Sequence, residues 1–150
     1  MWFEITDKNS LLCFMKRIDY FHDSCLKELK YTSGAFVNED LSMHPINDQR
    51  VLTVVFQQQR EESPMIELEF SELKYMKLIP IGDQYTCELL DATLMIDNDS
   101  FYWADMGGLS VEGLKLYDGT VICASKLRWR FVDGNMGNED YYRSGTQTIC

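Results

Sequence analysis

Residues 114–132 read LKLYDGTVICASKLRWRFV, and this stretch decides the fold class that the sequence predicts. Asp118-Gly119 suits a two-residue type I′ turn, because both central residues of that turn need a positive φ. The turn joins two runs in which apolar residues alternate with polar ones. Leu114–Val132 is therefore predicted to form a β-hairpin, which indicates a sheet-rich protein.

The second run of this hairpin alternates in charge as well as in hydrophobicity. One face is predicted to be buried, by the period of two, and carries Val121, Cys123, Ser125, Leu127, Trp129 and Phe131. The opposite face places Lys126, Arg128 and Arg130 in a row. The carboxylates of Glu67 and Glu69 share one face of another alternating segment, and cross-strand pairing with these cations is the predicted arrangement. The alternative is an anion-binding stripe.

Short strands joined by tight turns account for most of the remaining chain. The predicted strands cover residues 2–5, 25–31, 51–60, 65–70, 75–81, 85–96, 101–103 and 111–117. Apolar residues recur at helical spacing over residues 8–19, with Asp7 or Asn9 as the expected cap. The predicted fold is mainly β (α+β by strict count): an antiparallel β-sandwich or open barrel, with one N-terminal amphipathic helix packed on the sheet.

Length and composition favour one domain. The chain has 150 residues, of which 45% are hydrophobic, and this is enough for a single core. Residues 1–132 are expected to form that domain, and residues 133–150, which lack periodicity, are expected to be a flexible tail. The polar residues 35–49 form the longest expected internal loop. No membrane-spanning run and no signal-peptide pattern is found, so a cytoplasmic protein without a membrane partner is expected.

Charge and cysteine spacing limit the function classes. The net charge of −10 argues against binding a nucleic-acid backbone and indicates either a solubility role for the charge or a basic protein partner. The five cysteines are widely and irregularly spaced, which predicts neither a disulfide framework nor a zinc site. The segment Asp97-Asn98-Asp99-Ser100 lacks the glycine and the distal glutamate of a calcium loop. No metal and no cofactor is expected.

Two groups of residues are candidate sites. His22, Asp23 and Cys25 supply the residue types of Cys–His catalysis, but adjacency in sequence does not create the required geometry, so turn and core roles are the alternative. Tyr102 and Trp103 belong to an aromatic strand that could bind a ligand by stacking. Their rings should point to opposite faces of the sheet, and one face is expected to be core. No catalytic residue is assigned.

The segment FHDSCLKELKYTSG at residues 21–34, with YWAD at residues 102–105, resembles small uncharacterised proteins encoded in bacterial genomes. The resemblance implies a bacterial cytoplasmic protein. It transfers no catalytic role to any residue.

The sequence leaves two hypotheses of function. The first is a non-enzymatic binding or interaction protein that uses its acidic surface or an open sheet edge, for example an immunity-type protein that masks a cationic toxin. The alternative is a small-ligand-binding β-barrel or an enzyme with a pocket inside the sheet, around Tyr85, Glu88, Asp91 and Trp103.

Overall fold

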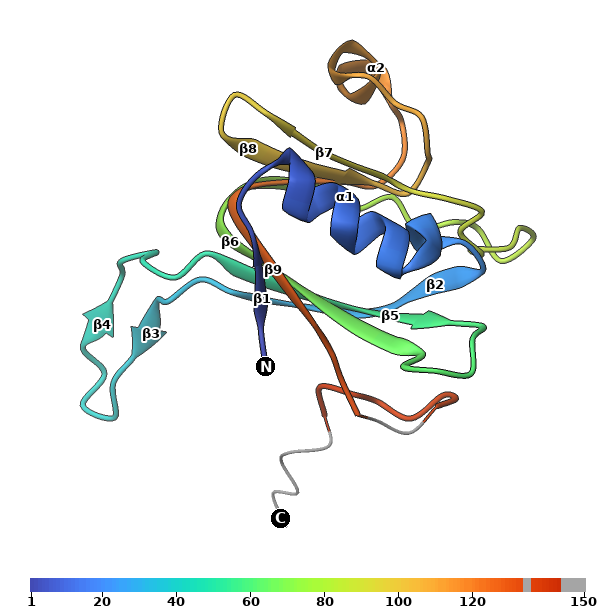
Figure 1. Cartoon of the computed structure of the whole chain (residues 1–150). Coiled ribbons are helices and arrows are strands. Elements are labelled where there is room, and N and C mark those ends of the chain that lie inside the picture. The colour runs from blue at the N-terminus through green and yellow to red at the C-terminus, as the bar shows by residue number, and fades with distance from the viewer. Residues whose placement is uncertain (134–135, 144–150) are drawn as a thin grey trace.

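The chain folds around one large antiparallel sheet (Figure 1). The structure is a computed structural model and describes residues 1–133 and 136–143. The elements are β1 (Phe3–Ile5), α1 (Lys8–Arg17), the 3-10 turn η1 (Asp19–Phe21), β2 (Ser24–Thr32), β3 (Phe36–Val37), β4 (Met43–His44), β5 (Val51–Gln58), β6 (Met65–Lys77), β7 (Thr93–Asp97), β8 (Ser100–Ala104), α2 (Val111–Leu116) and β9 (Val121–Phe131). The mainly β fold class, with an N-terminal helix on the sheet, is confirmed.

Strand β9 lies at the centre of the sheet. The strands follow the order β2-β5-β6-β9-β8-β7, and β1 pairs with β9 outside this path. On one side β9 pairs with β6 along its whole length. On the other side β8 pairs with residues 121–124 of β9, and β1 pairs with residues 127–129. The ends of the path, β2 and β7, do not pair with each other, so the described strands form an open sheet rather than a closed barrel.

Helix α1 covers one face of the sheet (Figure 1), and the main core lies between the two. The helix begins at the predicted cap, where Asp7 Oδ1 accepts from Ser10 N at 2.7 Å and Ser10 Oγ accepts from Asp7 N at 3.1 Å. This reciprocal capping box satisfies two backbone donors that a helix start leaves free. The largest fully buried side chains of the core are Phe14, Ile18, Phe21, Leu52, Phe56, Ile66, Leu68, Phe70, Trp103, Ile122 and Leu127.

The two central strands change their buried face part-way along. The core side chains of β6 are Ile66, Leu68, Phe70 and then Leu73, and those of β9 are Trp129, Leu127 and then Ala124 and Ile122. Glu72 lies at the switch with a left-handed φ of 52°, and the register of the two strands shifts just beyond it. A bulge of this kind rotates the strand. Val121 and Cys123 are buried as predicted, but Val121 packs in a smaller apolar cluster with Ala104 and Leu114 rather than in the main core. The expectation of one core face along the whole strand is wrong, because Ile122 and Ala124 of the opposite face enter the main core in its first half.

The predicted hairpin at Asp118-Gly119 is also wrong. Its first half is helix α2, whose cap Ser110 accepts from Gly113 N at 3.0 Å. Neither Asp118 nor Gly119 has the positive φ that a type I′ turn requires. A Cβ at Gly119 would lie 2.3 Å from the hydroxyl oxygen of Tyr117, so a larger residue there requires the Tyr117 ring to move.

Three further boundaries differ from the predictions. β6 is one strand of 13 residues, Met65–Lys77, and joins the predicted segment 65–70 to the first three residues of the segment 75–81, whose remaining residues 78–81 are not in a strand. Of the predicted strand 85–96, only the part from Thr93 onward is extended in the sheet. The expected loop 35–49 contains the paired strands β3 and β4. The length of β6 is set by its long-range partner β9, whereas β3 with β4, and β7 with β8, pair with a neighbour in the sequence.

Candidate functional site

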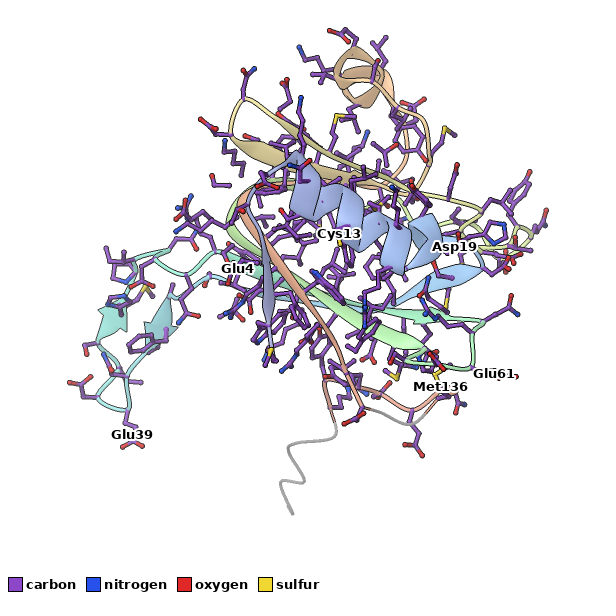
Figure 2. All side chains as sticks on the ribbon, in the orientation of Figure 1. Glu4, Cys13, Asp19, Glu39, Glu61 and Met136 are labelled. Carbon is purple, nitrogen blue, oxygen red and sulfur yellow. The ribbon has the colours of Figure 1, made fainter. Side chains whose placement is uncertain are left out.

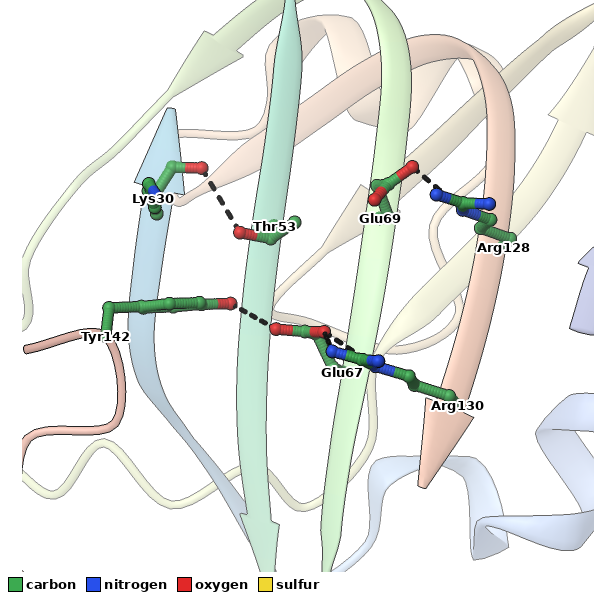
Figure 3. A network of polar contacts seen from close by, with 7 residues as sticks. All are labelled: Lys30, Thr53, Glu67, Glu69, Arg128, Arg130 and Tyr142. Carbon is green, nitrogen blue, oxygen red and sulfur yellow. Dashed lines mark hydrogen bonds and ion pairs between the residues drawn. The ribbon is translucent and has the colours of Figure 1, made fainter. Parts of the chain in front are cut away.

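The predicted charge pairing between β6 and β9 is confirmed (Figure 3). Glu67 faces Arg130 and Glu69 faces Arg128 in the strand register, and the shortest nitrogen–oxygen distance in both ion pairs is 2.8 Å. Lys126 Nζ lies 2.6 Å from a carboxylate oxygen of Glu72. Because each of the three cations already contacts a carboxylate, the pairing favours a structural role over an anion-binding stripe.

Glu67 is the most enclosed carboxylate of this face. The residue is 3% exposed, and its second oxygen, Oε2, accepts a hydrogen bond of 2.8 Å from the hydroxyl of Tyr142. Burial, with a smaller contribution from the Glu67 carboxylate, raises the pKa of Tyr142. The ring of Trp2 covers the guanidinium groups of Arg128 and Arg130, at 4.5 and 4.3 Å from its centroid. This polar network joins both ends of the described chain to the centre of the sheet.

Residues 136–143 lie against the edge strand β2. Lys27 Nζ donates to the carbonyl oxygen of Gly137 at 2.8 Å, and the backbone N–H of Tyr141 donates to Glu28 Oε2 at 2.5 Å. The rest of the expected flexible tail, at residues 134–135 and 144–150, lies outside the described residues.

His22, Asp23 and Cys25 lie where the chain enters β2. His22 Nδ1 is 3.0 Å from Asp23 Oδ2. Asp23 and Cys25 line a cavity of about 370 Å³, whereas His22 lies with Asp23 at another cavity of about 250 Å³. Burial raises the pKa of the Cys25 thiol, which disfavours the thiolate that a nucleophile needs. The structure thus places Asp23 beside both residues without forming a Cys–His pair.

Tyr102 and Trp103 point to opposite faces of β8, as the period of two predicts. Trp103 is fully buried in the main core, where its ring centroid is 5.4 Å from that of Phe56 and 6.1 Å from that of Phe21. Tyr102 is half-buried and packs against the smaller cluster beneath α2. Burial raises the pKa of the Tyr102 hydroxyl, and Cys123 adds to the effect. Neither ring stands free on the surface.

The segment between β2 and β5 projects from the sheet as a two-stranded arm, defined here as residues 33–50 (Figure 1). Figure 2 shows Glu39 at its far end, away from the main body. The tip is closed by hydrogen bonds from Asn38 N to Ser42 O (2.8 Å) and from Leu41 N to Asn38 O (3.0 Å). Asp40 Oδ1 also accepts from Ser42 N at 2.9 Å. The tip is therefore an ordered turn.

The base of the arm depends on a glycine. The backbone N–H groups of Gln49 and Arg50 both donate to Ser33 O, at 3.0 and 3.1 Å. Gly34 has a φ of +101°, and a Cβ there would lie 2.1 Å from Asp48 Oδ1 and 2.8 Å from Gln49 N. Only glycine allows the two sides of the arm to approach this closely.

The surface of the arm is unusually apolar for an exposed segment. Five large side chains are each more than half exposed: Phe36, Val37, Leu41, Met43 and Ile46. Leu41 is 83% exposed and has a φ of 69°, a conformation that costs a bulky side chain about 1 kcal/mol or more. Neither the strain nor the exposure of Leu41 favours folding. Sequence reasoning missed the arm, although the pairs Phe36-Val37 and Met43-His44 around a polar turn are a short hairpin signal.

No family model, curated protein sequence or solved structure matches this chain. Within residues 1–133 and 136–143, no group of three or more His, Cys, Asp or Glu side chains is placed to hold a metal ion. Cys13, Cys25, Cys87 and Cys123 are free thiols, and Cys150 lies outside the described residues. No helix in the described part of the chain has the length and apolar character that a membrane crossing requires.

Proposed function

We propose that this chain is a non-enzymatic binding protein whose arm docks onto a basic protein partner. The observation that carries the proposal is the arm surface, where five large apolar side chains are exposed on an ordered hairpin. Exposed apolar clusters with polar surroundings are typical of protein-interaction sites.

Charge distinguishes the partner from a second copy of the same chain. The protein carries a net charge of −10, and the arm adds the exposed carboxylates of Glu39, Asp40 and Asp48 around its apolar side chains. Two such arms would repel each other, whereas a basic surface would be attracted and would bind faster. Arg50, at the base, is the one basic residue of the arm besides His44.

Order in the arm reduces the entropic cost of binding. The tip and the base are both closed by backbone hydrogen bonds, and the ring of Phe36 stacks on that of His44 at a centroid distance of 4.9 Å. His44 Nε2 is also 3.1 Å from Asp48 Oδ2. A surface that is already ordered loses less freedom on docking than a flexible loop would.

One specific form of the proposal is an immunity-type protein that masks a cationic toxin in the bacterial cytoplasm. The acidic net charge supports this form, and so does the resemblance of residues 21–34 and 102–105 to small bacterial proteins. The wide, irregular spacing of the cysteines suits a reducing compartment.

Affinity capture from cells that express the protein tests the proposal. The natural chain is compared with an arm variant, Glu39→Gln, Asp40→Asn and Asp48→Asn, at low and at high salt. A matched control changes three exposed carboxylates elsewhere, Glu61→Gln, Glu62→Gln and Glu112→Gln, and therefore alters the net charge equally. Captured proteins are identified by mass spectrometry, and the purified pair is measured by calorimetry.

We expect a basic protein in one-to-one ratio that binds the natural chain and the control, weakens at high salt, and is lost with the arm variant. Absence of a basic partner at low salt, or equal binding by the arm variant, would contradict the proposal. Self-association through the arm would contradict it as well, because a second copy is acidic.

A further inference from the structure

We propose that a second site, separate from the arm, binds a small uncharged ring compound that carries a hydrogen-bond acceptor such as a ketone oxygen. The site is a cavity of about 140 Å³ between β2, the end of β8 and residues 78–89. Its apolar lining consists of Leu26, Leu78, Ile79, Ile81, Leu89 and Trp103.

A buried donor without an acceptor marks this cavity. Trp103 is fully buried, and its indole Nε1–H has no hydrogen-bond partner within residues 1–133 and 136–143. The rings of Phe21 and Phe56 pack against the indole and hold it in place. A buried donor without an acceptor is costly, and nearly all such groups in proteins are paired. Trp103 lines the cavity but is fully covered, so a ligand oxygen would supply the missing acceptor after the neighbouring side chains of the lining move apart to admit it.

The mouth of the cavity is apolar and formed by a segment with few ties to the sheet. Leu78, Ile79 and Ile81 are each about half exposed at this rim. The segment is attached at one end by Ile79 N, which donates to Thr120 Oγ1 at 3.0 Å, and at the other by Leu89 N, which donates to a carbonyl of β2 at 2.7 Å. An apolar rim above a buried polar group is the usual composition of a small-molecule site.

Size and charge define the class of ligand. An engineered apolar cavity of about 150 Å³ accepts benzene, so a single six-membered ring matches this volume. The carboxylates of Glu88 and Asp105 also line the cavity and disfavour an anion. A cation would leave the indole N–H unpaired, because that group can only donate. An uncharged ring with a carbonyl oxygen meets all three conditions.

A bound water is the competing occupant. A buried water needs two to four polar partners. Thr120 Oγ1, a polar atom of the lining, already accepts from Ile79 N and donates to Ile79 O at 3.4 Å. The carboxylates of Glu88 and Asp105 remain as polar partners for a water, but six of the ten lining residues are apolar, so a ring would contact more of the lining than a water would. A saturable shift on addition of cyclohexanone distinguishes the two occupants.

Nuclear magnetic resonance of the indole N–H groups tests the site in the full chain. The probes are cyclohexanone, cyclohexane as the hydrocarbon control and cyclohexanecarboxylate as the anionic control. We expect cyclohexanone to shift the Trp103 indole resonance downfield in a saturable way and to leave that of Trp129 unchanged. Cyclohexane should bind about tenfold more weakly because it lacks the acceptor, and the carboxylate should not bind.

Two substitutions separate a specific site from general apolar binding. Trp103→Phe identifies the resonance, removes the donor and should weaken cyclohexanone binding about tenfold. Leu26→Phe fills the cavity with Trp103 intact and should abolish binding, whereas Leu29→Phe, on the same strand but outside the lining, should not. If Trp103→Phe fails to fold, the two leucine variants decide the question.

An unmoved Trp103 resonance, equal affinity for cyclohexane, or full binding by Leu26→Phe would overturn the proposal. None of these readouts involves the arm, so failure here leaves the proposed docking function intact, and the reverse also holds.

Discussion

The hydroxyl of Tyr142 donates to Glu67 Oε2 over 2.8 Å, which ties the C-terminal segment to the middle of the sheet. The other carboxylate oxygen of Glu67 is 2.8 Å from a guanidinium nitrogen of Arg130. Because Glu67 is buried, both contacts act where water screens them little. Loss of either partner would leave an oxygen of this buried carboxylate without its hydrogen-bond or ion-pair partner.

Replacing Tyr142 by Phe should lower the free energy of unfolding by about 1.5 kcal/mol at pH 8, because Glu67 loses a donor and gains none. Urea unfolding followed by tryptophan fluorescence measures the change. Tyr85→Phe is the control, since that ring is mostly exposed and should alter stability by less than about 0.5 kcal/mol.

The same tyrosine makes stability sensitive to alkaline pH. Burial raises the pKa of Tyr142 above its value of 10.0 in the unfolded chain, so the folded state holds the phenolic proton more tightly. Stability from this group is complete below pH 10 and is lost as the pH rises above 10. Unfolding measured at pH 8 and pH 11 should show a smaller loss for Tyr142→Phe than for the natural chain. An identical loss would show that Tyr142 does not titrate in this way.

The two arginines of the polar network should differ in their effect on stability. Arg130→Ala leaves the Glu67 side chain, 4% exposed, without its cation and should cost about 2–4 kcal/mol. Arg128→Ala affects the more accessible Glu69, 14% exposed, and should cost about 1 kcal/mol. Adding Glu67→Gln to Arg130→Ala should restore part of the loss, because the unpaired charge is removed. Equal costs for the two alanine variants would contradict the burial argument.

Trp129→Ala should cost about 3–5 kcal/mol, because it leaves a cavity among aromatic rings. The ring of Trp129 lies 4.8 Å from that of Phe14, 4.9 Å from that of Phe3 and 5.1 Å from that of Phe131, measured between centroids. Chemical denaturation measures this change in the free energy of unfolding. Trp2→Ala, which removes a ring from the guanidinium groups rather than from the core, should cost about 1 kcal/mol.

Gly34→Ala should lower the free energy of local opening at the base of the arm by more than about 1 kcal/mol, because the φ of residue 34 is positive and the new Cβ meets the backbone of Gln49. Hydrogen exchange should therefore become faster at the amides of Gln49 and Arg50. Gly82→Ala is a suitable control, since a Cβ there meets nothing within 4 Å. Unchanged protection of both amides would mean that the arm does not need glycine here.

Leu41→Asn should stabilise the tip of the arm by about 0.5–1 kcal/mol, because asparagine tolerates the left-handed conformation better than leucine does. The same change should weaken partner binding, since it removes the most exposed apolar side chain of the tip. Hydrogen exchange at the tip and calorimetry with the partner measure the two effects. A stabilised tip with unchanged binding would remove Leu41 from the interface.

The sequence predicted those features that depend on alternation within a strand. The pairing of Glu67 and Glu69 with cations of β9 followed from charge on matching faces, although which carboxylate meets which cation did not. The capped N-terminal helix followed from helical spacing after Asp7. The hairpin prediction failed because the run from Val111 to Leu116 is only six residues long. At that length, the apolar spacing fits a helix as well as a strand.

The candidate sites were harder to predict because their parts are distant in the chain. Alternation placed Tyr102 and Trp103 on opposite faces, but it could not show that Leu26, Ile79 and Trp103 enclose one cavity. The arm was expected to be a loop because each of its strands has two residues, too few to show a period. For the cavity the missing information was long-range contact, whereas for the arm it was a local hairpin signal too short to recognise.

The central position of β9 has a consequence for synthesis of the protein on the ribosome. β9 follows every other described strand in the chain, yet β1, β6 and β8 all pair with it (Figure 1). At about 5–20 residues per second, the inner edge of β6 waits several seconds for its partner to be translated. During that interval an unpaired strand edge beside an incomplete core is open to aggregation. The nascent chain should therefore depend on chaperones, and folding should be completed only after β9 has left the ribosome.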